Sequence, residues 1–539
     1  MTTLIIVLAL VGLLLVSVPL FVIIGVITVL GFVLTGHASG LMDVELVEYM
    51  RELTGKPPLL AVPFFVLSGT IMSHGAIASR LVGVARASFS GLPGGLGIAT
   101  VVACMFFAAI SGSSPVTVIT IGGVMYPALI EAGYSKRFST GLVTSAGTLG
   151  ILIPPSIPMI VYAIFAGGNI KVEDLFLAGL GPGIIIGLLL SGFCMIVGLK
   201  KGERFGTPNF REIGHAFADG FWALMLPVII LGGIYSGIFT ANDAAAISVV
   251  YSLVVELFIH REVKLKDLPG IVGEASVLMG SLLVIFAMAV GLNGLLADLE
   301  IPQEAAKWLA SLDLTPFTFF LILNGLLLIV GCLMDIMSAI MILVPLLVPM
   351  AAQMGIDPIH LGVVFIVNLE LGYLTPPMGL NLFVSSSIFQ QSIGSVVRSV
   401  IPFTGLLLAA CLIITYVPTI SLGPVRALNG ESFFVAFPDA QDVKVVSDDD
   451  GALEDDDDDD LDDDDDDGAG KPANGGQSIQ DLMKSNNAFD DAMDEDDEDD
   501  EDEDDEDEDD EAGGGQPKSI QELMKSNDDF KEAFDEDDE

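Results

Sequence analysis

Two clusters of oxygen-bearing side chains interrupt long apolar stretches of this sequence. One is SGSSPVT, Ser111–Thr117, which carries four hydroxyl groups, and the other is Asp335 followed by Ser338. Each cluster precedes a Pro-Pro pair inside an apolar run, Pro154-Pro155 in the first case and Pro376-Pro377 in the second. Proline interrupts a helix and frees backbone carbonyl groups. Neutral oxygens of this kind suit a hard monovalent cation such as Na⁺ better than a soft metal.

The two clusters occupy equivalent positions in an internal duplication. One constant shift along the chain places Ser113 on Asp335, and GILIPP (150–155) on GYLTPP (372–377) without a gap. A single matched Pro-Pro pair is weak evidence. Several identities in register, in matching apolar contexts, predict a repeat.

The elements that position these residues are apolar segments of two lengths. Runs long enough for membrane helices recur from Leu4 to Val417, and the chain is 52% hydrophobic. A helix needs about 20 apolar residues to span a bilayer, and several runs are shorter and occur in pairs. We interpret the pairs 94–131 and 316–351 as re-entrant hairpins. The pairs 138–166 and 359–390 meet at a Pro-Pro, and we interpret each as one discontinuous helix.

The predicted fold class is an all-α polytopic membrane protein, an inverted repeat with re-entrant hairpins and discontinuous helices, and a disordered acidic C-terminal tail. The expected regions are N-terminal helices with an amphipathic arm (1–58), a first repeat (59–199), connecting scaffold helices (200–270), a second repeat (271–422) and the tail (423–539).

Basic loops predict the orientation in the membrane. Lys200–Arg211 and Arg261–Lys266 are expected on the cytoplasmic side by the positive-inside rule. When the membrane crossings are counted from these loops, the two copies of the repeat enter the membrane from opposite sides. The repeat is therefore predicted to be inverted. The same count places the N-terminus and the C-terminus outside the cytoplasm.

Helices broken in hydrocarbon persist only inside protein, around a ligand or beside a water-filled cavity, and inverted repeats of them are typical of secondary transporters. The N-terminal ends of half-helices carry partial positive charge and suit a substrate carboxylate. The candidate substrate-binding residues are Ser111, Ser114, Thr117, Ser338 and Asn381. The alternative is that these Gly and Ser residues only permit close helix packing. Two symmetry-related breaks favour the binding site.

Two acidic residues in apolar surroundings have two interpretations each. Asp335, at a hairpin turn, is either a cation ligand or proton site, or a buried residue bonded to nearby backbone groups. We favour the functional interpretation for Asp335. Glu370 has the same two interpretations, and the sequence does not decide between them.

Other chemistry has little support in the sequence. There is no Walker motif, no metal-spaced His pair and no catalytic-triad pattern, and each of the four cysteines lies alone in an apolar run. We therefore expect no enzyme activity, no organic cofactor and no nucleic-acid partner. A passive ion channel or pore is the alternative to a transporter, although a selectivity filter usually needs an oligomeric axis.

Four segments carry a resemblance to a known family: AAISGSSPVTVITIG, GTLGILIPPSIPM, GIDPIHLG and GYLTPPMGLNLF. Together they resemble the large membrane subunit of tripartite ATP-independent periplasmic (TRAP) transporters. The resemblance implies an elevator-type secondary transporter with an ion-transporter-superfamily-like fold, driven by a Na⁺ gradient, in the cytoplasmic (inner) membrane of a bacterium or archaeon. It also implies two partners, a small four-helix membrane subunit and an extracytoplasmic substrate-binding protein that delivers a small organic acid such as a dicarboxylate.

The resemblance also implies two Na⁺ sites, one at each break. The first would involve Ser113 with carbonyl groups of Gly150, Leu152 and Pro155. The second would involve the residues of the second break and its hairpin turn, Gly331, Asp335, Gly372, Thr375 and Met378.

The acidic tail departs from the family pattern. The net charge of the chain is −48, and most of its acidic residues follow residue 430. Such charge density cannot bury a core and predicts disorder. The tail repeats a nonamer, SIQDLMKSN (478–486) and SIQELMKSN (519–527). We interpret the nonamer as belonging to a solvated spacer, with a short partner-docking helix as the alternative.

Overall fold

The computed structural model describes residues 20–34, 57–167, 170–207, 209–299, 314–377 and 379–438, together with Glu304 and Lys307. The chain divides into Met1–Gly451 and Ala452–Glu539, and the described residues all belong to the first unit. Most of the predicted N-terminal region (residues 1–58), residue Met378 and nearly all of the acidic tail lie outside the described residues. The expectations for those segments stay predictions.

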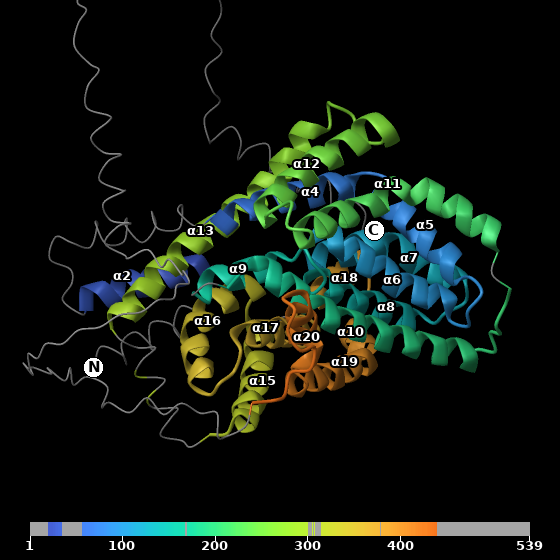
Figure 1. Ribbon diagram of the computed structural model, residues 1–539. Helices are drawn as coiled ribbons and strands as arrows, with labels where there is room; N and C mark the ends of the chain where they lie inside the picture. Colours follow the sequence, from blue (N-terminus) through green and yellow to red (C-terminus); the bar gives the residue numbers. More distant parts are fainter. Residues whose placement is uncertain are drawn as a thin grey trace, which may run out of the picture. The chain divides into compact units, whose positions relative to one another are not determined.

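Helices are the regular elements of the described residues (Figure 1). Their bounds are α2 (Leu20–Leu34), η1 (Pro57–Leu60), α4 (Ala61–His74), α5 (Ile77–Phe89), α6 (Gly95–Ser111), α7 (Ser114–Glu131), α8 (Lys136–Ala146), η2 (Gly147–Ile151), α9 (Ile157–Phe165), α10 (Val172–Lys200), α11 (Phe210–Tyr235), α12 (Ala241–Val254), η3 (Val255–His260), α13 (Leu268–Asp298), α15 (Pro316–Leu333), α16 (Ile336–Gln353), α17 (Pro358–Gly372), α18 (Leu380–Ile388), α19 (Ile393–Tyr416) and α20 (Thr419–Leu428).

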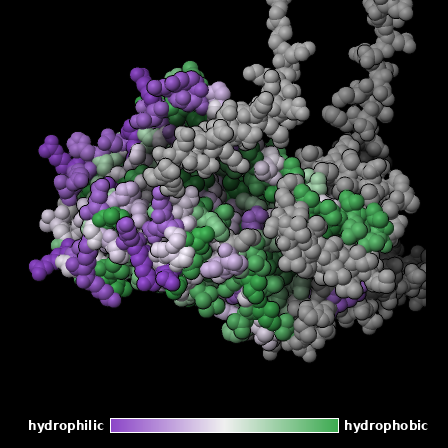
Figure 2. All heavy atoms as spheres, turned by 180° about the vertical axis from the view of Figure 1, so that it is seen from behind, coloured by the Kyte–Doolittle hydropathy of each residue, from purple (hydrophilic) through white to green (hydrophobic). Residues whose placement is uncertain are grey.

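Many of these helices can cross a membrane. Within the described residues, eight helices have the required length and apolar character, and the pair Pro58–His74 and Ile77–Phe89 bends by 71° at its junction. Large apolar side chains such as Leu188, Val250 and Val277 are exposed. On the face that Figure 2 shows, apolar residues gather in the middle and lower part, and hydrophilic residues gather toward the left edge. The expected all-helical, multi-span architecture is confirmed.

Two helix pairs turn within two residues. Gly112 and Ser113 join α6 to α7, and Met334 and Asp335 join α15 to α16. Gly112 has a φ of 57°, a left-handed conformation that glycine adopts without a Cβ clash. Ser113 and Asp335 are the N-cap residues of α7 and α16. The two residues that the sequence repeat aligns therefore occupy the same position in their turns.

The two apolar runs with a Pro-Pro pair are interrupted. After α8 the chain tightens into the 3₁₀ turn η2, and α9 begins only at Ile157. The Ser156 hydroxyl accepts a hydrogen bond from Met159 N (3.4 Å) and so caps the new helix. In the other run, α17 ends at Gly372 and α18 begins at Leu380. Both Pro-Pro peptide bonds are cis.

Two sets of helices pack closely within themselves and also contact each other, chiefly where α4 and α5 pack on α6. One contains α4, α5, α11, α12 and α13: α4 packs on α12 and α13, and α5 packs on α11. The second contains the turns and interruptions: α7 packs on α8 and α18, α17 packs on α15, and α8 packs on α19. Helix α13 continues beyond the first group alongside α2 (Figure 1).

The fold continues past the predicted start of the tail at residue 423. Helix α20 crosses that position, and the Thr419 hydroxyl donates a hydrogen bond to Val435 O (2.9 Å). The Phe437 ring lies 5.9 Å from the Phe320 ring. The apolar residues of SFFVAFP (432–438) explain this packing, because the dense acidic composition begins only after them.

Candidate cation and substrate site

The first hairpin turn and the first interruption lie in direct contact. A Cβ atom on Gly150 would lie 2.6 Å from the Ser113 carbonyl oxygen and 2.6 Å from Thr117 Oγ1. A Cβ on Gly112 would lie 2.9 Å from the Pro155 carbonyl oxygen. Glycine at both positions permits this close approach of two backbones. The structure thus brings Ser113, Gly150 and Pro155 together.

Hydroxyl groups surround the Ser113 carbonyl. Thr117 Oγ1 donates to it (2.8 Å), and the Ser111 hydroxyl lies 3.1 Å from Thr117 Oγ1. Leu152 is placed differently, because its carbonyl oxygen would lie 2.7 Å from a Cβ on Gly179 and so faces α10. Leu152, one of the four residues predicted for the first Na⁺ site, therefore has its carbonyl group against α10.

The second hairpin and the second interruption also meet through glycines. A Cβ on Gly372 would lie 2.7 Å from the Gly331 carbonyl oxygen, and one on Gly379 would lie 2.9 Å from the Thr375 carbonyl oxygen. The Thr375 hydroxyl donates to Leu371 O (2.9 Å). Met378, also predicted for this site, lies outside the described residues.

Asp335 acts as a helix cap in this structure. Its carboxylate accepts hydrogen bonds from Ser338 N (3.0 Å) and from the Ser338 hydroxyl (2.6 Å). This geometry satisfies an N-terminal donor of α16 and agrees with the backbone-bonded interpretation, whereas the sequence favoured the functional one, which stays a prediction. Ser338, predicted as a substrate residue, is engaged by the same bonds.

Tyr373 is a site residue that the sequence analysis missed. Its hydroxyl accepts a hydrogen bond from Ile336 N (3.3 Å), and so it joins the second interruption to the second hairpin turn. The available signal was the aromatic residue in GYLTPP, where the first copy, GILIPP, has isoleucine.

Asn381 and Ser114 link the two halves of the chain. Asn381 Nδ2 donates to the Ser114 hydroxyl (2.7 Å), and both side chains are fully buried. Asn381 Oδ1 has no hydrogen-bond partner among the described residues. A buried acceptor without a partner is costly unless a ligand supplies a donor or a cation.

A polar layer that the sequence did not reveal continues from this link between α7, α8 and α18. Thr144 Oγ1 donates to the Ser385 hydroxyl (2.7 Å). Gln391 Nε2 donates to the Thr140 hydroxyl (2.7 Å) and to the Tyr126 hydroxyl (2.9 Å). These are neutral hydrogen-bonding groups in an apolar protein, as a binding site for a small polar solute requires.

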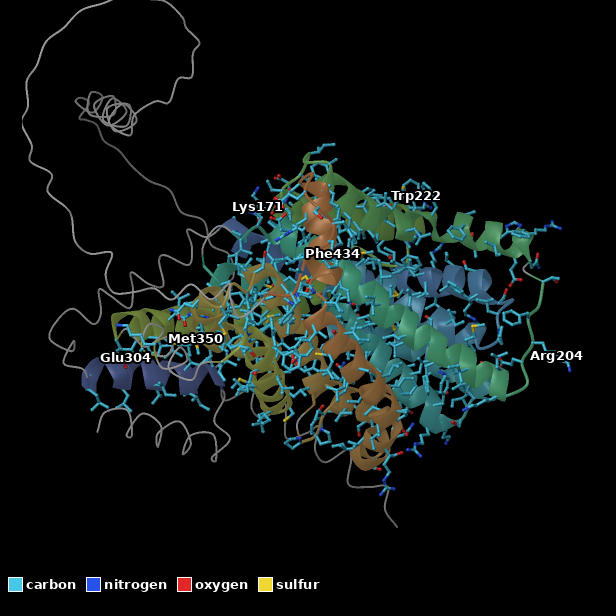
Figure 3. The ribbon with its side chains drawn as sticks, turned by 60° about the horizontal axis from the view of Figure 1, so that its bottom comes forward. Lys171, Arg204, Trp222, Glu304, Met350 and Phe434 are labelled. Atoms are coloured by element: carbon cyan, nitrogen blue, oxygen red, sulfur yellow. The ribbon has the colours of Figure 1, made fainter. Side chains whose placement is uncertain are left out.

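Glu203 holds both open ends of the first hairpin. It lies in the loop between α10 and α11, where Arg204 points outward (Figure 3). Its carboxylate accepts hydrogen bonds from Gly94 N (2.7 Å), just before α6, and from the Tyr134 hydroxyl (2.9 Å), just after α7. Partial burial raises the pKa of the Glu203 carboxyl, but hydrogen bonds from Gly94, Tyr134 and Lys201 outweigh it and leave this pKa below its ordinary value.

The donors at both interruptions fit Na⁺. They are carbonyl and hydroxyl oxygens, which hard cations prefer. Among the residues that the structure describes, no three His, Cys, Asp or Glu side chains gather as a transition metal would require. The assignment of Na⁺ to these oxygens stays a prediction.

Residues 7–420 match the family described as "Tripartite ATP-independent periplasmic transporter, DctM component". The chain belongs to this family. The match covers nearly all of the described helices, and it confirms the resemblance drawn from the four segments. The protein is therefore a multi-pass membrane permease of a bacterial TRAP transporter and not an enzyme.

Individual relatives agree with this assignment. The chain is 45% identical over 365 residues to a C4-dicarboxylate TRAP transporter large permease protein of Pseudomonas aeruginosa, covering 68% of this chain and 85% of that one. It is 38% identical over 410 residues to an isethionate TRAP transporter permease protein, DctMQ, of Oleidesulfovibrio alaskensis, covering 75% of this chain and 64% of that one.

A solved structure shares the fold. The YdaH transporter of Alcanivorax borkumensis matches 74% of this chain and 91% of its own, with a TM-score of 0.55 and 14% sequence identity. At this identity the likeness concerns the fold alone.

Proposed function

We propose that this DctM permease carries out Na⁺-coupled secondary active uptake of a small organic acid by an elevator mechanism. The observation that carries the proposal is the pair of glycine contacts, Gly150 on Ser113 and Gly372 on Gly331, which brings a backbone carbonyl oxygen of each hairpin against its interrupted helix. A bound cation supplies positive charge that lowers the cost of bringing an organic anion into an apolar site.

The sequence repeat and the matching turns support an inverted repeat with re-entrant hairpins. Ser113 and Asp335 are equivalent N-caps, and each hairpin packs on its own interrupted helix. The group of α4, α5, α11, α12 and α13 would serve as the scaffold, and the hairpins and interrupted helices as the moving group. Both termini would then lie outside the cytoplasm.

The relatives support the substrate class. Their names give C4-dicarboxylate and isethionate as substrates, and both are small organic anions. We infer that Asn381 and Ser114, with Ser111 and Thr117 nearby, contact such a substrate. A small four-helix membrane subunit and an extracytoplasmic substrate-binding protein would complete the tripartite system.

Uptake into proteoliposomes tests this function. The chain is reconstituted with the other two components of its transporter, and entry of a labelled C4-dicarboxylate is measured with an inward Na⁺ gradient or an equal K⁺ gradient. We expect accumulation above the external concentration only with Na⁺. Entry that merely equilibrates, and is the same in both salts, would instead identify a passive channel or pore.

A further inference from the structure

Among the described residues, two glutamates have buried side chains, and the surroundings of the two carboxylates differ. Glu256 is 0% exposed and Glu370 is 2% exposed. A carboxylate removed from water is costly unless it is hydrogen-bonded or paired with a cation. The hydrogen-bond partners of each carboxylate therefore indicate whether it requires a bound cation.

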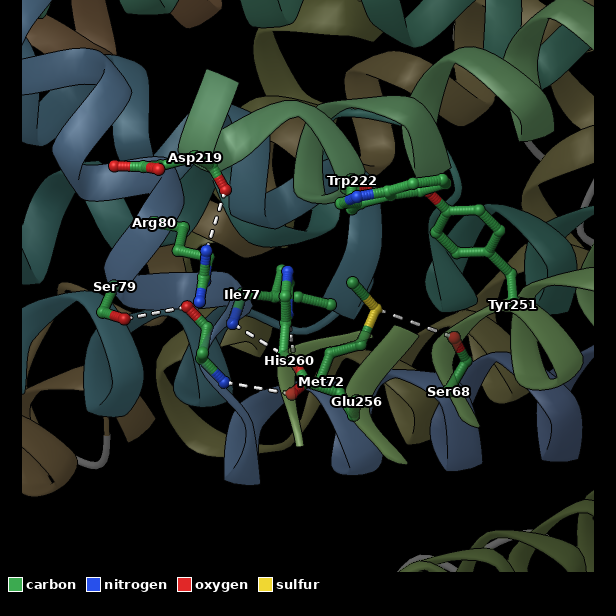
Figure 4. A network of polar contacts seen from close by, with 11 residues as sticks. Ser68, Met72, Ile77, Ser79, Arg80, Asp219, Trp222, Tyr251, Glu256 and His260 are labelled. Carbon is green, nitrogen blue, oxygen red and sulfur yellow. Dashed lines mark hydrogen bonds and ion pairs between the residues drawn. The ribbon is translucent and has the colours of Figure 1, made fainter. Parts of the chain in front are cut away.

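Glu256 is satisfied by the protein itself (Figure 4). Its carboxylate accepts hydrogen bonds from Ala76 N and Ile77 N, both at 3.2 Å, where α5 begins. His260 Nδ1 lies 3.7 Å from Glu256 Oε1, and the Arg80 side chain is close by. Glu256 thus fastens the bend between α4 and α5 to η3 and has a structural role.

Glu370 has no such partners. Neither carboxylate oxygen makes a hydrogen bond within the described residues of the chain. It lies on α17, which packs against η2 of the first half. Glu370 therefore lies where the two interrupted helices meet, and the Thr148 side chain of η2 is next to its carboxylate.

Further oxygens of the first half face this position. The Thr148 hydroxyl of η2 lies beside the Glu370 carboxylate and also donates to Ser145 O (2.6 Å). Ser145 lies one turn earlier on the same face, and its buried hydroxyl has no hydrogen-bond partner among the described residues. These carboxylate and hydroxyl oxygens are the donor types that hard cations prefer.

We propose that Glu370, Thr148 and Ser145 form a third Na⁺ site between the two interrupted helices. This inference rests on the proposed Na⁺ coupling and deepens it, because the site adds one ion to those at the two interruptions. It is built from both halves of the chain, so ion binding there would hold α17 against η2.

The test counts bound Na⁺ by its effect on unfolding. The thermal midpoint of the purified full-length chain is measured against Na⁺ concentration, with choline keeping the ionic strength constant. The slope of this midpoint against the logarithm of the Na⁺ concentration gives the number of Na⁺ ions that are released on unfolding. Glu370→Gln keeps the side-chain shape and removes its charge, and Glu256→Gln is the matched control.

We expect Glu370→Gln to release one ion fewer than wild type and Glu256→Gln to release the same number as wild type. If Glu370→Gln released the same number of Na⁺ ions on unfolding as wild type, the third site would be overturned. Wild-type protein without any Na⁺ dependence would contradict the proposed function as well.

A second variant covers the case in which Glu370→Gln does not fold. Thr148→Val retains the carboxylate and removes one hydroxyl ligand. We expect the Na⁺ concentration that gives half of the stabilisation to rise by about tenfold, which corresponds to the loss of one moderate ligand contact. An unchanged half-saturation concentration would also contradict the site.

Discussion

Individual polar side chains have two kinds of role in this permease. Asp335 caps α16, and Glu203 ties the ends of the first hairpin to the loop between α10 and α11. These groups have their hydrogen-bond partners within the protein. Glu370 and Asn381 keep free oxygens in buried positions, which is the condition expected of residues that receive a ligand.

Replacement of Glu203 tests the structural role of such a carboxylate. Because the pKa of Glu203 is lowered on folding, its contribution to stability is complete above the ordinary value of 4.5 and is lost as the pH falls through the lower folded value. We expect Glu203→Gln to lower the free energy of unfolding at neutral pH by about 1 kcal/mol, since water screens a partly exposed group.

The measurement is the thermal midpoint of both proteins from neutral pH to below 4.5. The difference in thermal midpoint between wild type and Glu203→Gln should disappear at acid pH. The exposed Glu131→Gln serves as the control and should follow wild type throughout. A gap that stays constant with pH would show that Glu203 acts through packing and not through its charge.

The link between Ser114 and Asn381 gives a second prediction. Ser114→Ala leaves the buried Asn381 Nδ2 without its acceptor, so the free energy of unfolding should fall by about 1–3 kcal/mol. Ser281→Ala is the comparison, because the Ser281 hydroxyl is exposed and bonds only its own helix. Thermal unfolding compares the two, and equal midpoints would mean that the link contributes nothing.

At the scale of elements, the molecule repeats one arrangement. A tight helix pair capped at its second helix packs on a helix that stops at a Pro-Pro, and glycines form the contact in both halves. The halves differ in detail, because the first interruption contains the turn η2 whereas α17 stays α-helical to Gly372.

Alanine at Gly372 should disrupt this arrangement. The new Cβ would lie 2.4–2.7 Å from backbone atoms of Gly331, and a backbone cannot give way as a side chain can. We expect a loss of about 1–3 kcal/mol from overpacking, together with weaker Na⁺ stabilisation. Gly405→Ala is the matched control, since a Cβ there would meet no atom within 4 Å.

The two variants are compared by thermal unfolding with and without Na⁺. If Gly372→Ala and Gly405→Ala gave the same Na⁺ response, the second interruption would not be a cation site.

At the scale of the whole molecule, the two halves are interwoven. Helix α18 of the second half packs on α7, and α17 packs on η2. A ligand at this junction would contact both halves at once, so its binding could favour one arrangement of these helices over another.

Much of this organisation could be predicted from the sequence. The Pro-Pro pairs and the apolar runs predicted the interrupted helices, because proline acts locally on the helix that contains it. The four family segments predicted the assignment, which is confirmed. The Na⁺ residues stay predictions.

Other features depend on residues far apart and had no local signal. Asn381 bonds Ser114 across 267 positions, and Glu256 bonds Ala76 across 180. Polar residues such as Thr144 and Ser385 look like ordinary helix residues until the fold brings them together. The packing of α20 was missed because the start of the tail was placed from composition alone.

The most direct test of Na⁺ coupling at the interruptions is to count ions and substrate in the same vesicles. Radioactive Na⁺ and a labelled C4-dicarboxylate are followed together in proteoliposomes, for wild type, Gly150→Ala and the control Gly123→Ala, where a new Cβ meets nothing within 4 Å. We predict that more than one Na⁺ enters with each substrate molecule in wild type and Gly123→Ala, and that Gly150→Ala loses coupled entry. Substrate accumulation without any entry of Na⁺ would contradict the proposed Na⁺ coupling.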